Sequence, residues 1–125
     1  MNYRLKKISG DASFREFYRL KKGNKTSIIV QAKKEKFKNL ITYVIINKVL
    51  RENKINAPKL ISNHYQNHMI EISDLGEKSF YDVIIKKKNK LNYYKDLIKI
   101  ILKLQKIKIK KKYNFKKYNI KLQKY

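Results

Sequence analysis

Residues 10–17 read GDASFREF, and they span most of a predicted loop over 9–13 and the start of the strand that follows it. The loop joins two stretches with strand-like alternation, 3–8 and 14–20. A glycine next to small and hydroxyl residues lets a hairpin tip approach an anion closely, because backbone N–H groups can point at phosphate oxygens without an intervening side chain. An ordinary hairpin turn has the same composition. The run therefore predicts a β-hairpin, and phosphate binding is one of its two interpretations.

The stretch after the hairpin predicts a third antiparallel strand and then a helix. A turn at residues 22–25 leads into a strand over 27–32. From Phe37 to about Glu52 the apolar residues recur at helical spacing, and Pro58 stands beyond the end, where a helix could not continue.

Two further strands and a helical region complete the predicted fold. Residues 59–63 and 68–73 read as a hairpin that turns at 66–67. Ser79 is placed to cap a short helix, and a longer helix is expected over about residues 92–107. The expected class is α+β, with a five-stranded antiparallel sheet, one inserted helix and helices after it.

The formal net charge of +24 raises the question of a nucleic-acid partner, because clustered lysines neutralise phosphates and release counterions. Lysine, isoleucine, asparagine and tyrosine, all encoded by A/T-rich codons, make up 69 of the 125 residues. Lysine also outnumbers arginine by 29 to 4, whereas proteins that read bases favour the bidentate guanidinium. We expect no nucleic-acid binding beyond nonspecific charge attraction.

Composition also limits which cofactors the protein is expected to bind and where in the cell it is expected to occur. The chain has no cysteine, which excludes disulfides and thiolate metal sites, and its two histidines, His64 and His68, are too few for a histidine-based zinc site. No apolar run approaches the roughly 18 residues that a membrane span needs, and the N-terminal residues lack the features of a signal peptide. We expect a cytoplasmic protein with no resident metal and no membrane partner.

Several segments in the same order resemble the bacterial cell-wall sugar kinases. Residues 9–20, SGDASFREFYRL, are similar to the family's GDASFRRYFRL opening, and residues 55–61 are similar to its entry into the fourth strand. Residues 69–76, MIEISDLG, resemble its LLLEDLG hinge, with Ser73 in place of a glutamate, and 97–105 lie where the family has a helix ending in LxxLQ. These kinases phosphorylate N-acetylmuramate and N-acetylglucosamine at the anomeric position, and they belong to the aminoglycoside phosphotransferase superfamily.

The resemblance implies a domain plan and an ATP site. It implies a kinase-like N-terminal lobe over residues 1–73, a hinge over 74–78, and the start of a truncated helical lobe with a lysine-rich tail over 79–125. The hairpin loop would cover the triphosphate, and the hinge would offer backbone groups to the adenine edge. From the sequence alone, residues 73–76 also fit a helix-capping turn. The residues implied for ATP binding are Gly10, Asp11, Ala12, Ser13, Arg15, Val30, Ile72, Ser73 and Asp74.

The catalytic half of such a kinase does not occur in this sequence. The superfamily uses a His-x-Asp-x-x-x-x-Asn loop and a later aspartate for Mg²⁺, and neither histidine here has an aspartate two residues on. The strand that usually carries the phosphate-pairing lysine has Gln31, and the nearest lysines are Lys33 and Lys34. We expect no catalytic residues and no metal ligands in this chain, and Mg²⁺ and a sugar acceptor only in a complete enzyme.

The expected function is therefore that of a nucleotide-binding fragment of a phosphotransferase, which binds ATP weakly and is inactive alone. The alternative is a small basic module that binds nucleic acid or an acidic protein surface. The last 23 residues favour that alternative, because they contain ten lysines and no acidic residue.

Overall fold

The computed structural model describes residues 3–8, 15–33, 37–110 and 113. It confirms the α+β class, with a five-stranded antiparallel sheet. The elements in chain order are β1 (Tyr3–Ile8), β2 (Glu16–Lys22), β3 (Lys25–Gln31), α1 (Phe37–Glu52), β4 (Leu60–His64), the 3-10 turn η1 (Tyr65–Asn67), β5 (Met69–Ser73), α2 (Phe80–Ile84) and α3 (Leu91–Gln105).

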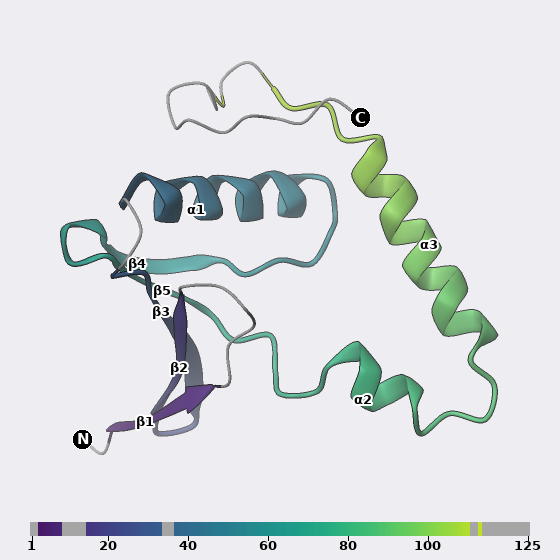
Figure 1. Cartoon of the computed structure of the whole chain (residues 1–125), viewed down its shortest axis with the longest axis horizontal. Coiled ribbons are helices and arrows are strands. Elements are labelled where there is room, and N and C mark those ends of the chain that lie inside the picture. The colour runs from purple at the N-terminus through teal and green to yellow at the C-terminus, as the bar shows by residue number, and fades with distance from the viewer. Residues whose placement is uncertain (1–2, 9–14, 34–36, 111–112, 114–125) are drawn as a thin grey trace.

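The strands lie in the order β1-β2-β3-β5-β4, so the helix between β3 and β4 carries the chain past the sheet before β4 and β5 return as a hairpin (Figure 1). In the centre of the sheet Ile28 pairs with Ile72, and Val30 pairs with Ile70. Paired residues share a face and side chains alternate along a strand, so these four apolar side chains lie together.

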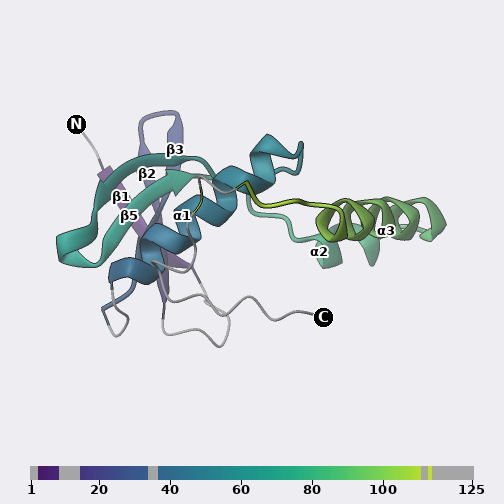
Figure 2. The ribbon, with the colours of Figure 1, turned by 90° about the horizontal axis from the view of Figure 1, so that it is seen from above.

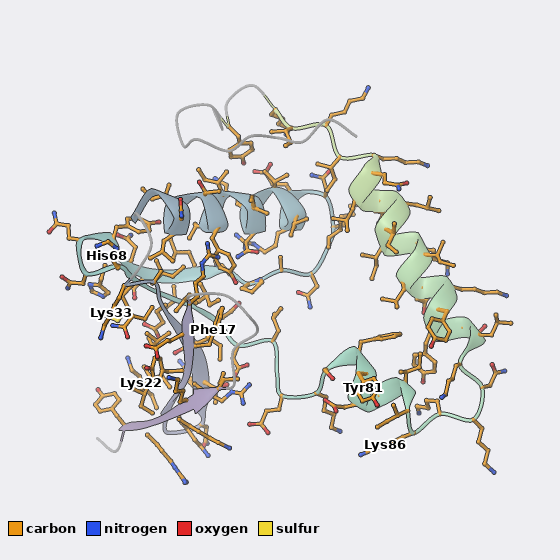
Figure 3. The ribbon with its side chains drawn as sticks, in the orientation of Figure 1. Phe17, Lys22, Lys33, His68, Tyr81 and Lys86 are labelled. Atoms are coloured by element: carbon orange, nitrogen blue, oxygen red, sulfur yellow. The ribbon has the colours of Figure 1, made fainter. Side chains whose placement is uncertain are left out.

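The core forms where this face meets α1. The fully buried side chains are Val30 and Ile70 from the sheet and Leu40 from the helix. Around them pack Ile8 and Phe17, which pair with each other at the ends of β1 and β2 next to the loop. Figure 3 shows Phe17 on β2 beneath α1. The side chains that anchor both strands of the predicted hairpin are therefore part of the core.

The end of α1 is closed by a Schellman motif. The N–H of Ile55 donates to the carbonyl of Leu50, and the N–H of Lys54 donates to the carbonyl of Arg51, both at 3.0 Å. Lys54 has φ +58°, the left-handed conformation that glycine adopts at lower cost. The Arg51 guanidinium also donates to the carbonyl of Pro58, which ties the helix to the segment that enters β4.

The strand boundaries differ from the sequence prediction at one turn. The second strand was expected over 14–20 and the third over 27–32, whereas β2 continues to Lys22 and β3 begins at Lys25. Gly23 has φ +56°, which allows a tight turn and keeps the two strands paired up to its edge. Residue 14 lies outside the described residues.

The two last helices extend away from the sheet (Figure 2). Ser79 caps α2 as expected, and the pair is reciprocal: its hydroxyl accepts from the Asp82 N–H at 3.1 Å, and the Asp82 carboxylate accepts from the Ser79 N–H at 2.9 Å. No residue of α3 is buried, and the Phe80 and Tyr94 rings meet edge to face at 6.5 Å. None of the helices in the described part of the chain has the length and apolar character needed to cross a membrane.

Replacing Lys54 with glycine is expected to stabilise the protein. A non-glycine residue in the left-handed region costs about 1–2 kcal/mol, part of which is offset because glycine also gains freedom in the unfolded chain. We therefore predict that Lys54→Gly raises the free energy of unfolding by about 0.5–1 kcal/mol, measured by urea denaturation.

The control is the same substitution at Lys48, an exposed position inside α1. There glycine should lower the free energy of unfolding by about 1 kcal/mol, because it loosens the helix interior. Equal destabilisation by the two variants would show that Lys54 does not hold the left-handed cap.

Candidate functional site

The structure describes only part of the predicted nucleotide loop. Gly10, Asp11, Ala12 and Ser13 lie outside the described residues. Arg15, which follows them, places its guanidinium carbon 5.2 Å from the centre of the Tyr43 ring on α1, at cation–π distance. The chain thus enters β2 next to the helix, on the face of the sheet that α1 covers.

The two apolar strand residues implied for ATP binding, Val30 and Ile72, are buried in the core. Val30 has no exposed surface and Ile72 is 3% exposed, while Ile28, opposite Ile72, is 9% exposed. A side chain without accessible surface cannot touch a ligand in this conformation. Val30 and Ile72 therefore act on any binding site on this face only through the packing of the core beneath it.

The linker between β5 and α2 is fastened to the sheet by Arg19. From the middle of β2, its guanidinium donates from Nε to Asp74 Oδ2 at 2.6 Å and from Nη2 to Asp74 Oδ1 at 3.1 Å. Nη1 donates to Glu77 Oε1 at 2.6 Å, and Nη2 also donates to the carbonyl of Gly76 at 3.1 Å. We call this set of contacts, from Arg19 to residues 74, 76 and 77, the Arg19 clamp.

The Arg19 clamp is largely shielded from water. The side chain of Arg19 is 16% exposed and that of Asp74 is 7% exposed, whereas that of Glu77 is 74% exposed. The hydrogen bond from Arg19 lowers the pKa of the Asp74 carboxyl below its usual value, and the Gly76 N–H, 2.9 Å from Asp74 Oδ1, lowers it further. Asp74 is therefore held ionised, and the contact to Asp74 contributes more than the exposed contact to Glu77.

Fewer backbone groups of the predicted hinge are available to hydrogen-bond a nucleotide than the resemblance implied. The Ser73 N–H donates to the Lys59 carbonyl at 2.8 Å, and the Ser73 hydroxyl accepts from the Lys59 N–H at 2.8 Å. Among the described residues, no hydrogen bond occupies the N–H of Leu75, and this residue is 55% exposed. Leu75 therefore carries one N–H donor that is available next to the clamp, and among the described residues the N–H groups of Glu77 and Lys78 have no partner either.

Two other sequence interpretations receive a structural answer. Residues 73–76 do not cap a helix, because the cap of α2 is Ser79. Lys33, one of the two lysines nearest Gln31, lies two residues beyond the end of β3 and is exposed (labelled in Figure 3). Among the residues that the structure describes, no group of three histidine, aspartate or glutamate side chains is arranged to hold a metal ion.

Sequence reasoning gave Arg19 no role, although it lies inside the motif at 9–20. One signal was present: Arg19 is two residues from Phe17 on a strand, so both face the core, where an arginine requires a partner. Its partner is 55 residues away, and only the assembled sheet brings the two together.

No protein-family model, curated protein or solved structure matches this chain.

The Arg19 clamp should make stability depend on acid. Because the pKa of folded Asp74 is depressed, its contribution to stability is fully present above the unfolded value near 3.9 and is lost as pH falls through the folded value. We predict that Asp74→Asn lowers the free energy of unfolding by about 2 kcal/mol at pH 7. This difference from the native protein should shrink steadily between about pH 5 and pH 2, measured by urea denaturation across that range.

Glu77→Gln is the matched control on the same guanidinium. Because the Glu77 side chain is exposed, this substitution should lower the free energy of unfolding by less than about 0.5 kcal/mol at pH 7. A difference between the native protein and Asp74→Asn that does not change with pH would contradict an ionised, clamped Asp74.

Proposed function

We propose that residues 3–78 form the nucleotide-binding lobe of a kinase-like phosphotransferase, of the kind to which the cell-wall sugar kinases belong. The nucleotide is ATP, and the acceptor in a complete enzyme is a sugar hydroxyl. The catalytic aspartate and the Mg²⁺ ligands come from outside these 125 residues, because the sequence holds no segment with their pattern.

The order of the elements supports this proposal. A hairpin with a small-residue loop is followed by a third strand, a helix packed on the sheet, two more strands and an exposed linker. Kinases cover the phosphates with such a hairpin and place a helix between the third and fourth strands. The combination of a hairpin loop, a helix-covered face and a linker at the end of β5 is more specific than any one of these features.

The single observation that carries the proposal is the position of the linker on β2. Arg19 binds Asp74 from the strand that follows the predicted phosphate loop, so the loop and the linker are joined by one short strand. The N–H of Leu75 next to this contact has no hydrogen-bond partner among the residues that the structure describes, and an adenine ring nitrogen can accept from it. Ser73, whose N–H is already bonded, is replaced by Leu75 as the proposed donor of the hinge.

The exposed surface of α3 supports an incomplete helical lobe. Its apolar side chains include Ile98, Ile101 and Leu102, which are 55%, 52% and 48% exposed. A helix of a folded domain normally buries such residues against a neighbour. In the proposed enzyme, the remaining helices of the second lobe cover them.

Nucleotide titrations at two salt concentrations test the proposal. We predict that the 125-residue chain binds ATP with a dissociation constant of about 1 mM or weaker, because one wall of the site is missing. Binding of CTP should be at least about fivefold weaker at both salt concentrations, since a pyrimidine does not reach the same backbone groups. Equilibrium binding followed by NMR line broadening measures both constants.

A matched pair of variants at Leu75 tests whether its backbone N–H is the hydrogen-bond donor to adenine. Leu75→Pro removes the backbone N–H and should bring ATP binding down to the level of CTP, whereas Leu75→Ala keeps the N–H and should leave the ratio unchanged. Equal binding of ATP and CTP by the native chain, falling together as salt rises, would contradict the proposal and favour a basic module that binds phosphates by charge. Turnover of ATP with an N-acetylated amino sugar would show that the chain is not catalytically incomplete.

A further inference from the structure

The linker carries two carboxylates, and Arg19 engages both. The Asp74 side chain uses Oδ2 to accept from Arg19 Nε, and Oδ1 to accept from Arg19 Nη2 and from the Gly76 N–H. The Thr26 side chain also donates to this carboxylate. With 7% of its surface exposed, this carboxylate has no oxygen free for a ligand. Glu77 accepts from Nη1 of the same guanidinium.

Adenine and guanine differ in what they require from such a linker. The edge of adenine presents a ring nitrogen that accepts a hydrogen bond and an amino group that donates one, and a backbone N–H and C=O satisfy these. Guanine presents a ring N–H and an amino group side by side, both donors, and a carboxylate with two free oxygens satisfies them. A free aspartate at a nucleobase edge therefore favours guanine, and a sequestered one does not.

We propose that Arg19 determines base selectivity: by occupying Asp74 it prevents this carboxylate from accepting the donors of guanine, and by fixing residues 74–77 it leaves the Leu75 N–H to read adenine. This inference rests on the proposed nucleotide site at the linker. It assigns Arg19 a positioning role without contact to the base.

The Arg19 clamp has the geometry that such a role requires. Every nitrogen of the guanidinium donates to the segment 74–77, so the loss of one arginine removes the charged partner of Asp74 and frees the backbone carbonyl of Gly76. The Gly76 N–H and the Thr26 side chain remain as neutral donors to the carboxylate. The planar guanidinium holds two oxygens of one carboxylate at once, which a neutral amide cannot reproduce. Arg19→Gln therefore leaves Asp74 with acceptor capacity that water or a ligand must satisfy.

The experiment compares AMP and GMP, which carry the same phosphate charge, so that attraction by the lysines cancels in their ratio. Dissociation constants are measured by NMR titration of the full chain for the native protein, Arg19→Gln and the double variant Arg19→Gln/Asp74→Asn. We expect the native protein to bind AMP at least about tenfold more tightly than GMP. In Arg19→Gln this ratio should fall at least about fivefold, and in the double variant the gain in GMP binding should disappear, because no free carboxylate remains.

The outcomes separate this inference from the proposed function. If the native protein binds AMP no better than CMP, the proposed nucleotide site fails, and the inference fails with it. If the native protein selects AMP, and Arg19→Gln keeps the same AMP to GMP ratio, the nucleotide site stands and the selectivity role of Arg19 is wrong.

Asp74→Asn alone gives an independent test if Arg19→Gln does not fold. The asparagine still accepts a hydrogen bond from Arg19 through its amide oxygen, and Asp74 does not touch the base in this proposal. GMP binding should therefore not become tighter than in the native protein, because an asparagine keeps one acceptor oxygen and cannot pair with both donors of guanine. A tenfold gain in GMP binding by Asp74→Asn would show that selectivity does not depend on a sequestered carboxylate and would overturn the inference.

Discussion

The ion pair between Arg19 and Asp74 decides where the chain runs after the sheet. It joins β2 to the linker across 55 residues, and both side chains are largely withdrawn from water. A shielded charge is costly unless it is paired, so movement of the linker away from β2 would leave Arg19 on the sheet without its carboxylate partner. The Gly76 N–H and carbonyl add hydrogen bonds to the same two side chains, which fixes the backbone as well as the charges.

The sheet can hold Arg19 in place because its neighbours on the same face are packed. Phe17 is part of the core on the same strand, and Ile28, which pairs with Arg19, is buried next to Ile72. The strand therefore has little freedom to twist, and the guanidinium extends from a fixed base. In the proposed enzyme, the rigid strand fixes the linker through Arg19 and so holds the Leu75 N–H at a defined position.

Local sequence signals predicted most of the fold. The helical spacing from Phe37 to Glu52 matches α1, and Ser79 caps α2 with the expected geometry. The end of β2 was placed too early, because only the paired strands show that the turn at Gly23 is so tight. The Schellman cap at Lys54 carried no signal, since the usual glycine is not there.

The candidate site was less accessible to sequence reasoning than the fold. The Ser73 N–H was expected to face a nucleotide and bonds Lys59 instead, a contact that depends on the register of β4 and β5. Val30 was implied for ATP binding, but the packing of Leu40 and Ile70 removes it from the surface. In each case the deciding partner lies far away in sequence, and the residue itself gives no indication of it.

A double-mutant cycle on Arg19 and Asp74 tests the central claim most directly. The free energies of unfolding of the native protein, Arg19→Gln, Asp74→Asn and the double variant are measured by urea denaturation at pH 7. If the Arg19 clamp joins β2 to the linker, the two substitutions should be coupled by about 1–3 kcal/mol, as expected for residues in a shared, shielded contact. Additive effects within about 0.5 kcal/mol would show that the two side chains do not hold each other, and would contradict this account of the linker.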